Sequence, residues 1–174
     1  MKQNSKIALG GIISALSLAL MLMTSVLPFL TYTLPILSGA LLMLIVIEIG
    51  KKWALYVYIS VSIISMFILA DKEAAIMYLM FFGYFPILKS VLEKKLKGFF
   101  EYLIKFLVFN SSILLSYVII VYIFRLPVET MTKTYLVLIL ISANVLFYMY
   151  DLMLTKLVMA YISNWRKSFI KLFK

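Results

Sequence analysis

The chain has 174 residues, of which 65% are hydrophobic and 14% are charged, and its mean hydropathy is +1.09. Since an ordinary soluble domain is about 45–50% apolar with about 25% charged residues, this composition excludes a soluble domain and predicts a protein that lies in a lipid bilayer. The sequence contains no histidine and no cysteine, which excludes Ser-His triads, thiol nucleophiles, haem attachment and nearly all transition-metal sites.

The apolar runs predict transmembrane helices. A chain that spans lipid forms helices or a closed barrel, and these uninterrupted runs are too long for barrel strands with alternating faces. Because about 20 apolar residues cross the hydrocarbon core, we predict an all-α polytopic membrane protein, with six transmembrane helices in one compact bundle that takes up residues 1–174. The predicted spans are about 7–27, 34–50, 53–70, 74–92, 103–124 and 135–160.

Each break between the predicted spans holds proline, glycine or charged residues. In chain order these are Pro28 and Pro35, Gly50-Lys51-Lys52, Asp71-Lys72-Glu73, the sequence EKKLKG and the sequence RLPVE. We interpret residues 7–27 as a first span rather than a secretory leader, because the apolar run is longer than a usual leader core. Inside the fourth span, Gly83 and Pro86 weaken backbone hydrogen bonding and predict a kink.

Lysine and arginine positions predict the orientation, because basic residues are retained on the cytoplasmic side. With the N-terminus inside, fourteen of the 17 basic residues lie in the cytoplasm, and only Lys72, Arg125 and Lys133 lie outside. We therefore predict a multi-pass protein of the cell membrane with both termini cytoplasmic. The net charge of +10 is interpreted as this orientation signal and as contact with anionic headgroups, not as nucleic-acid binding.

The acidic residues give little support to an enzyme. Glu48 and Asp151 are the acids inside the predicted spans, and the sequence has no clustered aspartate motif and no glycine-rich phosphate loop. We therefore predict no catalytic residues, no cofactor and no metal site.

Polar residues inside the predicted spans have structural interpretations. Glu48 lies four residues before Lys52 and is expected to pair with it at the headgroup level. Lys89, Lys105 and Lys156 are expected to extend to the inner surface.

Asp151 lies deeper in the bilayer, at a depth similar to that of Asn110 on the fifth span. An interhelical hydrogen bond is the favoured interpretation of Asp151, and proton or ion coupling is the alternative. Asn144, farther out on the last helix, suits packing and ligand contact equally.

The first span carries small residues at every fourth position, Gly11, Ala15 and Ala19. Small residues let another backbone approach closely, so this stripe predicts a helix-contact face. Both packing within the bundle and presentation to a separate subunit remain open.

Six spans in a chain of this length, the small-residue stripe and almost no soluble mass resemble the S components of energy-coupling factor transporters. The topology covers the whole chain, and Ala15 and Ala19 match the Ala-xxx-Ala pattern of that family. The resemblance implies capture of a vitamin or similar small solute at the outer face, with a transmembrane coupling subunit and ATPase subunits as partners. This chain has no Walker sequence, as such a division of labour requires.

The resemblance also implies that outward loops and outer helix halves form the solute pocket. The candidate solute-binding residues are Tyr32, Asp71, Lys72, Glu73, Tyr78, Phe82 and Asn144, with Thr31, Thr33, Phe81 and Tyr135 beside them. Aromatic rings with a few convergent polar groups suit a small planar or zwitterionic solute. The alternative interpretation is that the tyrosines belong to the interfacial belt and that the charged turn is only solvated.

Two other classes of protein fit the same sequence. A membrane scaffold subunit of a cell-envelope complex would also have short-looped helices and a basic inner face. A small self-contained proton-coupled carrier would use Asp151 and Asn110 as an intramembrane polar relay.

Overall fold

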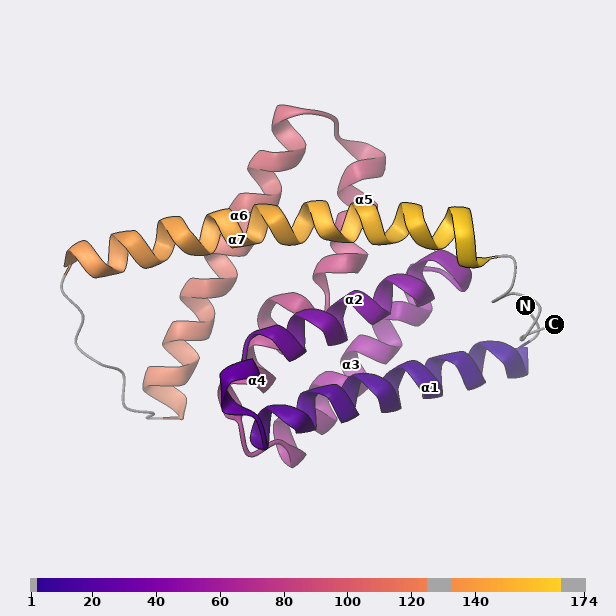
Figure 1. The fold of residues 1–174 in the computed structure, drawn as a ribbon, viewed down its shortest axis with the longest axis horizontal. Helices are drawn as coiled ribbons and strands as arrows, with labels where there is room; N and C mark the ends of the chain where they lie inside the picture. The colour runs from indigo at the N-terminus through magenta and orange to yellow at the C-terminus, as the bar shows by residue number, and fades with distance from the viewer. Residues whose placement is uncertain (1–2, 125–132, 167–174) are drawn as a thin grey trace.

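The computed structural model describes residues 3–124 and 133–166, without the side chains of residues 133–136. These residues form helices and connecting turns and no strand, which confirms the all-α prediction (Figure 1). In chain order the elements are α1 Gln3–Leu22, the 3-10 turns η1 Met23–Ser25 and η2 Pro28–Leu30, α2 Thr33–Glu48, α3 Lys51–Ile68, α4 Lys72–Met77, the π-helix η3 Tyr78–Phe82, α5 Phe85–Lys95, α6 Phe99–Val118, the π-helix η4 Ile119–Ile123, α7 Lys133–Ala160 and the π-helix η5 Tyr161–Trp165.

Five helical stretches are long and apolar enough to cross a membrane: Gln3–Ser25, Lys51–Ile68, Lys72–Lys95, Phe99–Ile123 and Val137–Trp165. The second predicted span corresponds to α2, which is apolar but has only 16 residues. At 1.5 Å per residue α2 is about 24 Å long, which is shorter than a hydrocarbon core of about 30 Å. The described residues therefore contain five long apolar helices and one shorter one.

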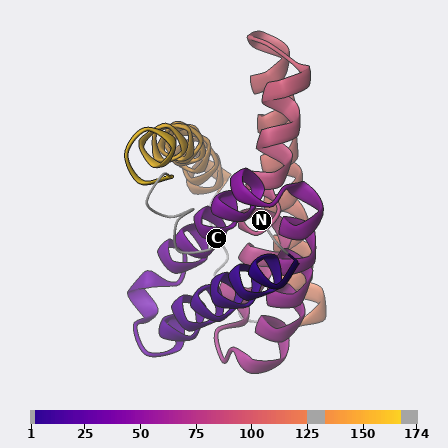
Figure 2. The same cartoon turned by 90° about the vertical axis from the view of Figure 1, so that its right-hand side faces the viewer.

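The helices form two packed groups. The first combines α1, α2, α3 and α4, which contribute Leu9, Leu42, Val61 and Ala75 to one buried cluster. The second cluster is aromatic and joins α2, η3, α5, α6 and α7; in it the rings of Phe109 and Phe147 stack at 4.5 Å. The antiparallel α5–α6 pair extends away from the first group (Figure 2).

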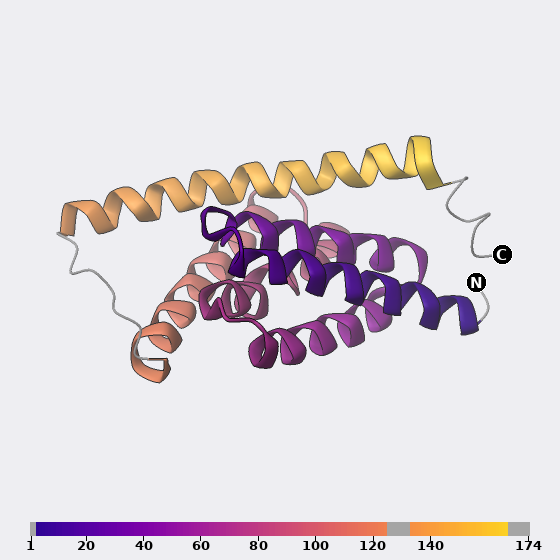
Figure 3. The same cartoon turned by 60° about the horizontal axis from the view of Figure 1, so that its bottom comes forward.

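α7 is the longest helix and lies along one side of the molecule, with the other helices below it in Figure 3. In Figure 1 it crosses the α5–α6 pair, and α1 begins at the same side of the molecule where η5 ends. The crossing point of α7 with α5 and α6 is where the buried charges described below are found.

The predicted kink of the fourth span is confirmed. α4 ends at Met77, the π-helix η3 follows, and α5 begins at Phe85 with Pro86 in its first turn. A side chain on Gly83 would approach the ring of Tyr58 to 2.5 Å, so Gly83 also allows close packing. The sequence cue therefore marks both a change of helix geometry and a tight contact.

The closest helix approach is at Gly39 of α2. A β-carbon added there would lie 2.2 Å from the carbonyl oxygen of Phe82, a backbone atom that cannot rotate away. Next to it, Ser17 of α1 and Ser38 of α2 each donate to the other's carbonyl oxygen at 3.4 Å. Small residues thus bring α2 against α1 and η3, as membrane helices commonly require.

We predict that Gly39→Ala destabilises the protein by about 1–3 kcal/mol, because the added methyl group overpacks a backbone contact. Gly11→Ala is the matched control, since nothing lies within 4 Å of a β-carbon at Gly11. Unfolding in mild detergent, followed by circular dichroism, measures both variants. Equal loss of stability in the two variants would contradict the tight contact at Gly39.

Candidate functional site

The two outer segments predicted to form the pocket mouth lie together. Thr31 donates from its hydroxyl to Asp71 Oδ2 at 2.8 Å, although the two residues are 40 positions apart in the chain. Tyr32 donates to Glu73 Oε2 at 3.4 Å. The loop after α1 and the start of α4 therefore form one cross-bridged surface.

The charges of this surface also have local structural partners. Asp71 is the N-cap of α4 and accepts from the backbone N–H of Ala74 at 3.1 Å. Lys72 donates to the carbonyl oxygens of Met66 and Leu69, both at 2.8 Å, and so satisfies the end of α3. The triplet is therefore not merely a solvated turn, and the contacts of Lys72 give it a structural role at the end of α3.

Tyr32 is the phenol of this surface. Burial, and after it the negative charges of Glu73 and Asp71, raises the pKa of Tyr32 above its ordinary value. The hydroxyl accordingly stays protonated at neutral pH and donates to Glu73.

The aromatic candidates lie deeper than the mouth. Tyr78 is fully buried and packs near Tyr58, with ring centroids 6.2 Å apart. Phe81 is buried in the aromatic cluster, and Phe82 is half-buried with its ring edge toward Tyr150. These rings therefore belong to the packed core and do not form an exposed wall.

Asn144 is bound to the fifth predicted span. Its amide and that of Asn110 exchange hydrogen bonds at 2.9 and 3.1 Å, and each also donates to the carbonyl oxygen four residues earlier, that of Leu140 or Phe106. This pair joins α7 to α6 away from the 31–33 and 71–73 segments. Thr33 is exposed at the start of α2, and the side chain of Tyr135 lies outside the described residues.

The small-residue stripe faces away from the bundle. Gly11, Ala15 and Ala19 are exposed on α1, whereas Leu9, Ile13 and Ser17 point into the core. Within the described part of the chain, no helix packs on this stripe. The geometry therefore favours the interpretation that the stripe is presented outward.

A buried charge cluster lies where α7 crosses α5 and α6, and we define it as Lys89, Glu93, Glu101, Lys105 and Asp151. The prediction that Lys89 and Lys105 extend to the membrane surface is wrong, because each is only 1% exposed. Both ammonium groups instead bind Asp151, which is itself buried.

The contacts of the charge cluster form a closed ring. Lys89 lies 2.6 Å from Asp151 Oδ1, and Lys105 lies 3.1 Å from Asp151 Oδ2. Glu93 Oε1 lies 2.5 Å from Lys89 and 3.1 Å from Lys105, which closes the ring on its other side. Glu101 adds a further contact to Lys105 at 2.6 Å.

Access to the charge cluster is one-sided. The Glu93 side chain is 38% exposed, while those of Asp151 and the two lysines are buried. The arrangement therefore holds α7 in register against α5 and α6.

The sequence contains a pattern that indicates part of the charge cluster, which the interpretation of each lysine by itself did not use. Lys89 and Glu93 are four residues apart, and so are Glu101 and Lys105, in mirrored order around a short turn. Two helices joined by such a turn pack antiparallel and bring the two pairs face to face. Asp151 could not be assigned to them, since nothing in the sequence places α7 against this hairpin.

A second ion pair joins α2 to the end of the chain's last helical stretch. Glu48 accepts from Arg166 Nε at 2.9 Å, so the predicted pairing with Lys52 is replaced by a contact between residues 118 positions apart. Lys52 is exposed, and so is Lys156.

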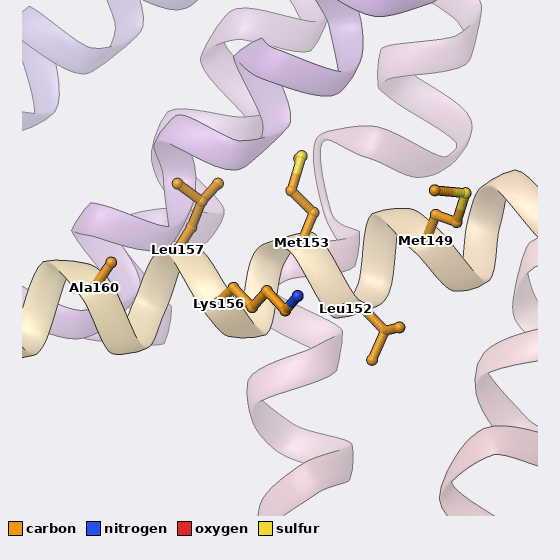
Figure 4. Close-up of a pocket in the computed structure, with 6 residues that line it drawn as sticks. All are labelled: Met149, Leu152, Met153, Lys156, Leu157 and Ala160. Atoms are coloured by element: carbon orange, nitrogen blue, oxygen red, sulfur yellow. The ribbon is translucent and has the colours of Figure 1, made fainter.

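Three grooves lie along α7. One of about 510 Å³ follows α7 from Met149 to Ala160 and is apolar except for Lys156 (Figure 4). Another of about 480 Å³ lies between α2 and the end of α7, and a third of about 470 Å³ is lined by Asn144 and Tyr148. Of the predicted solute-binding residues, Asn144 alone contributes to these three grooves.

Comparison of the chain with protein-family models, with curated proteins and with solved structures found no match.

We predict that Asp151→Asn destabilises the protein by about 3–5 kcal/mol, because it leaves buried ammonium groups without their shared counter-charge. The double variant Lys89→Met/Asp151→Leu removes one charge of each sign and leaves Lys105 with Glu93 and Glu101. It should therefore recover much of the loss. Titration of unfolding with denaturing detergent measures all three proteins, and wild-type stability in Asp151→Asn would contradict a stabilising cluster.

Proposed function

We propose that the protein spans the cell membrane six times, with both termini in the cytoplasm. Five long apolar helices and the shorter α2 support this topology, as does the location of fourteen of the 17 basic residues on one predicted side. The start of α1 and the end of η5 at one side of the molecule agree with an even number of crossings (Figure 1).

Within this topology, we propose that the chain captures a small solute at the outer face for uptake by an associated, ATP-driven module. The observation that carries the proposal is the cross-bridged surface made by Thr31 with Asp71 and by Tyr32 with Glu73. Segments 40 residues apart that meet through side chains can close over a ligand and separate again, as lids do.

The chemistry of the surface suggests the class of solute. Asp71 and Glu73 present carboxylates whose oxygens each accept more than one hydrogen bond. Lys72 is committed to the end of α3, so the surface has acidic character. A small solute with a positively charged group and a planar apolar part, such as a vitamin, fits these acids and the aromatic side chains that follow them in the chain.

The proposal assigns the energy source to other subunits. The exposed stripe of Gly11, Ala15 and Ala19 is the face that we assign to the transmembrane coupling subunit, because small residues allow close helix approach. The resemblance to S components of energy-coupling factor transporters supports the same division of labour.

We predict that Asp71→Asn and Glu73→Gln each weaken solute binding about tenfold or more, through loss of a charge-assisted hydrogen bond. Asparagine is a good N-cap, so Asp71→Asn keeps the start of α4 intact. Mass spectrometry of small molecules released from the purified protein identifies the solute, and titration then measures affinity. Lys52→Gln is the control, an exposed charge at the other end of the bundle. Unchanged affinity in both acidic variants would remove this surface from the solute site.

The charge cluster favours a second candidate, a proton-coupled carrier that works alone. Ionisable residues buried in membrane helices frequently mark proton pathways, and Glu93 gives this cluster a route to solvent.

For a carrier we predict solute flux driven by a pH gradient in liposomes that contain this chain alone. Glu93→Gln should abolish that flux, because the exchangeable carboxyl is lost while the contacts of Asp151 with Lys89 and Lys105 remain. Tight solute binding without flux supports the capture subunit instead, and absence of both rejects the two transport proposals together.

A further inference from the structure

The groove between α2 and the end of α7 has the dimensions of one lipid chain. Its α2 wall runs from Leu37 to Ile47, and its other wall runs from Leu157 of α7 to Trp165 of η5. Ten residues of α helix rise about 15 Å, which is half of a hydrocarbon core of about 30 Å. The groove therefore extends through about one leaflet.

The lining of the groove suits an acyl chain. Apart from the phenol of Tyr161 and the indole of Trp165, its lining side chains are aliphatic or Met43, and the groove has a volume of about 480 Å³. Its walls come from helices that are apolar enough to lie in the bilayer, so lipid tails have direct access to it. Apart from this phenol and indole, the lining has no polar side chain that would select a polar solute.

One end of the groove carries positive charge. Arg166 follows Trp165 directly and contacts Glu48 through Nε, while its side chain is 43% exposed. A guanidinium has five N–H donors and this contact uses one, so Arg166 can also bind an anion at the groove mouth. Lys52, four residues after Glu48 in the chain, is also exposed.

Trp165 marks the level of the headgroups. Its side chain is exposed, and tryptophan is enriched at the membrane–water interface. The apolar groove thus ends at an interfacial indole and a basic side chain, the order in which a phospholipid presents its tail and its anionic headgroup.

We propose that this groove is a specific site for an anionic phospholipid, with one acyl chain between α2 and α7 and the headgroup phosphate at Arg166. The bound lipid fills the space beside α7 next to the aromatic cluster, which shares Ala40, Met43, Ile47 and Val158 with the lining of the groove. This proposal needs the helices to lie in a membrane but does not depend on solute capture.

The test uses the full chain in nanodiscs made from equal parts of phosphatidylglycerol and phosphatidylcholine. Native mass spectrometry of the ejected protein should show preferential retention of phosphatidylglycerol. Leu37→Trp, which fills the groove, should lower that retention about fivefold, as should Arg166→Gln, since one basic contact to an anionic lipid is lost.

Two controls separate lipid binding from a change of fold. Leu55→Trp makes the same substitution at a leucine that is 43% exposed, against 42% for Leu37, but lies outside the groove. Glu48→Gln removes the ion pair and keeps the charge of Arg166, so it should retain the lipid. Equal retention of the two lipids by the wild type, equal loss in Leu37→Trp and Leu55→Trp, or loss in Glu48→Gln as large as in Arg166→Gln would overturn the site. A second copy of the chain in the groove would appear as a dimer that Leu37→Trp dissociates, and this outcome would also overturn it.

Discussion

The position of α7 depends on Asp151, which binds Lys89 of α5 and Lys105 of α6 at once. Lipid tails are as apolar as the surfaces of these helices, so in a bilayer the hydrophobic effect does not decide where one helix packs on another. A buried carboxylate that binds two ammonium groups does determine how these helices pack, because any other register leaves charges unpaired in a low-dielectric medium. The stacked rings of Phe109 and Phe147 then complete the same contact.

Because α7 is held at only a few points, grooves remain along it. The charge cluster and the aromatic cluster hold the middle of the helix, and the Glu48–Arg166 pair holds its end near α2. Between these points the side chains of α7 leave grooves open to lipid. A lipid in the groove beside α2 would support a helix that few protein contacts support, which links the proposed lipid site to the stability of the bundle.

At the opposite end of the molecule, the residues of the solute proposal also stabilise the fold. Asp71 caps α4 and accepts from Thr31, and Lys72 satisfies the end of α3, so the mouth segments are ordered by the same charges that the solute proposal uses. Beneath them, Gly39 allows α2 to reach the backbone of η3. The π-helix η3 follows α4 directly and contributes Phe81 to the aromatic cluster, so one continuous chain segment connects the 71–73 surface to the core.

The sequence by itself determined the helical class, the apolar stretches, their breaks and the kink of the fourth helix, because these follow from local composition and from backbone chemistry at proline and glycine. It also brought residues 31–33 and 71–73 into one hypothesis, and they do meet. Only the tertiary structure decided the partners of the buried charges. Lys89 and Lys105 each have a reasonable local interpretation as surface anchors, and Glu48 has a lysine four residues away, yet their actual partners come from other helices. The interhelical hydrogen bond expected of Asp151 is present, but its partners are the two lysines, while Asn110, which matches Asp151 in depth, pairs with Asn144. Helices that are apolar on all sides give no periodic signal of which face packs, so the rotation and crossing of α7 are fixed by these long-range polar contacts. The packing of α2 on η3 is fixed by the close approach at Gly39.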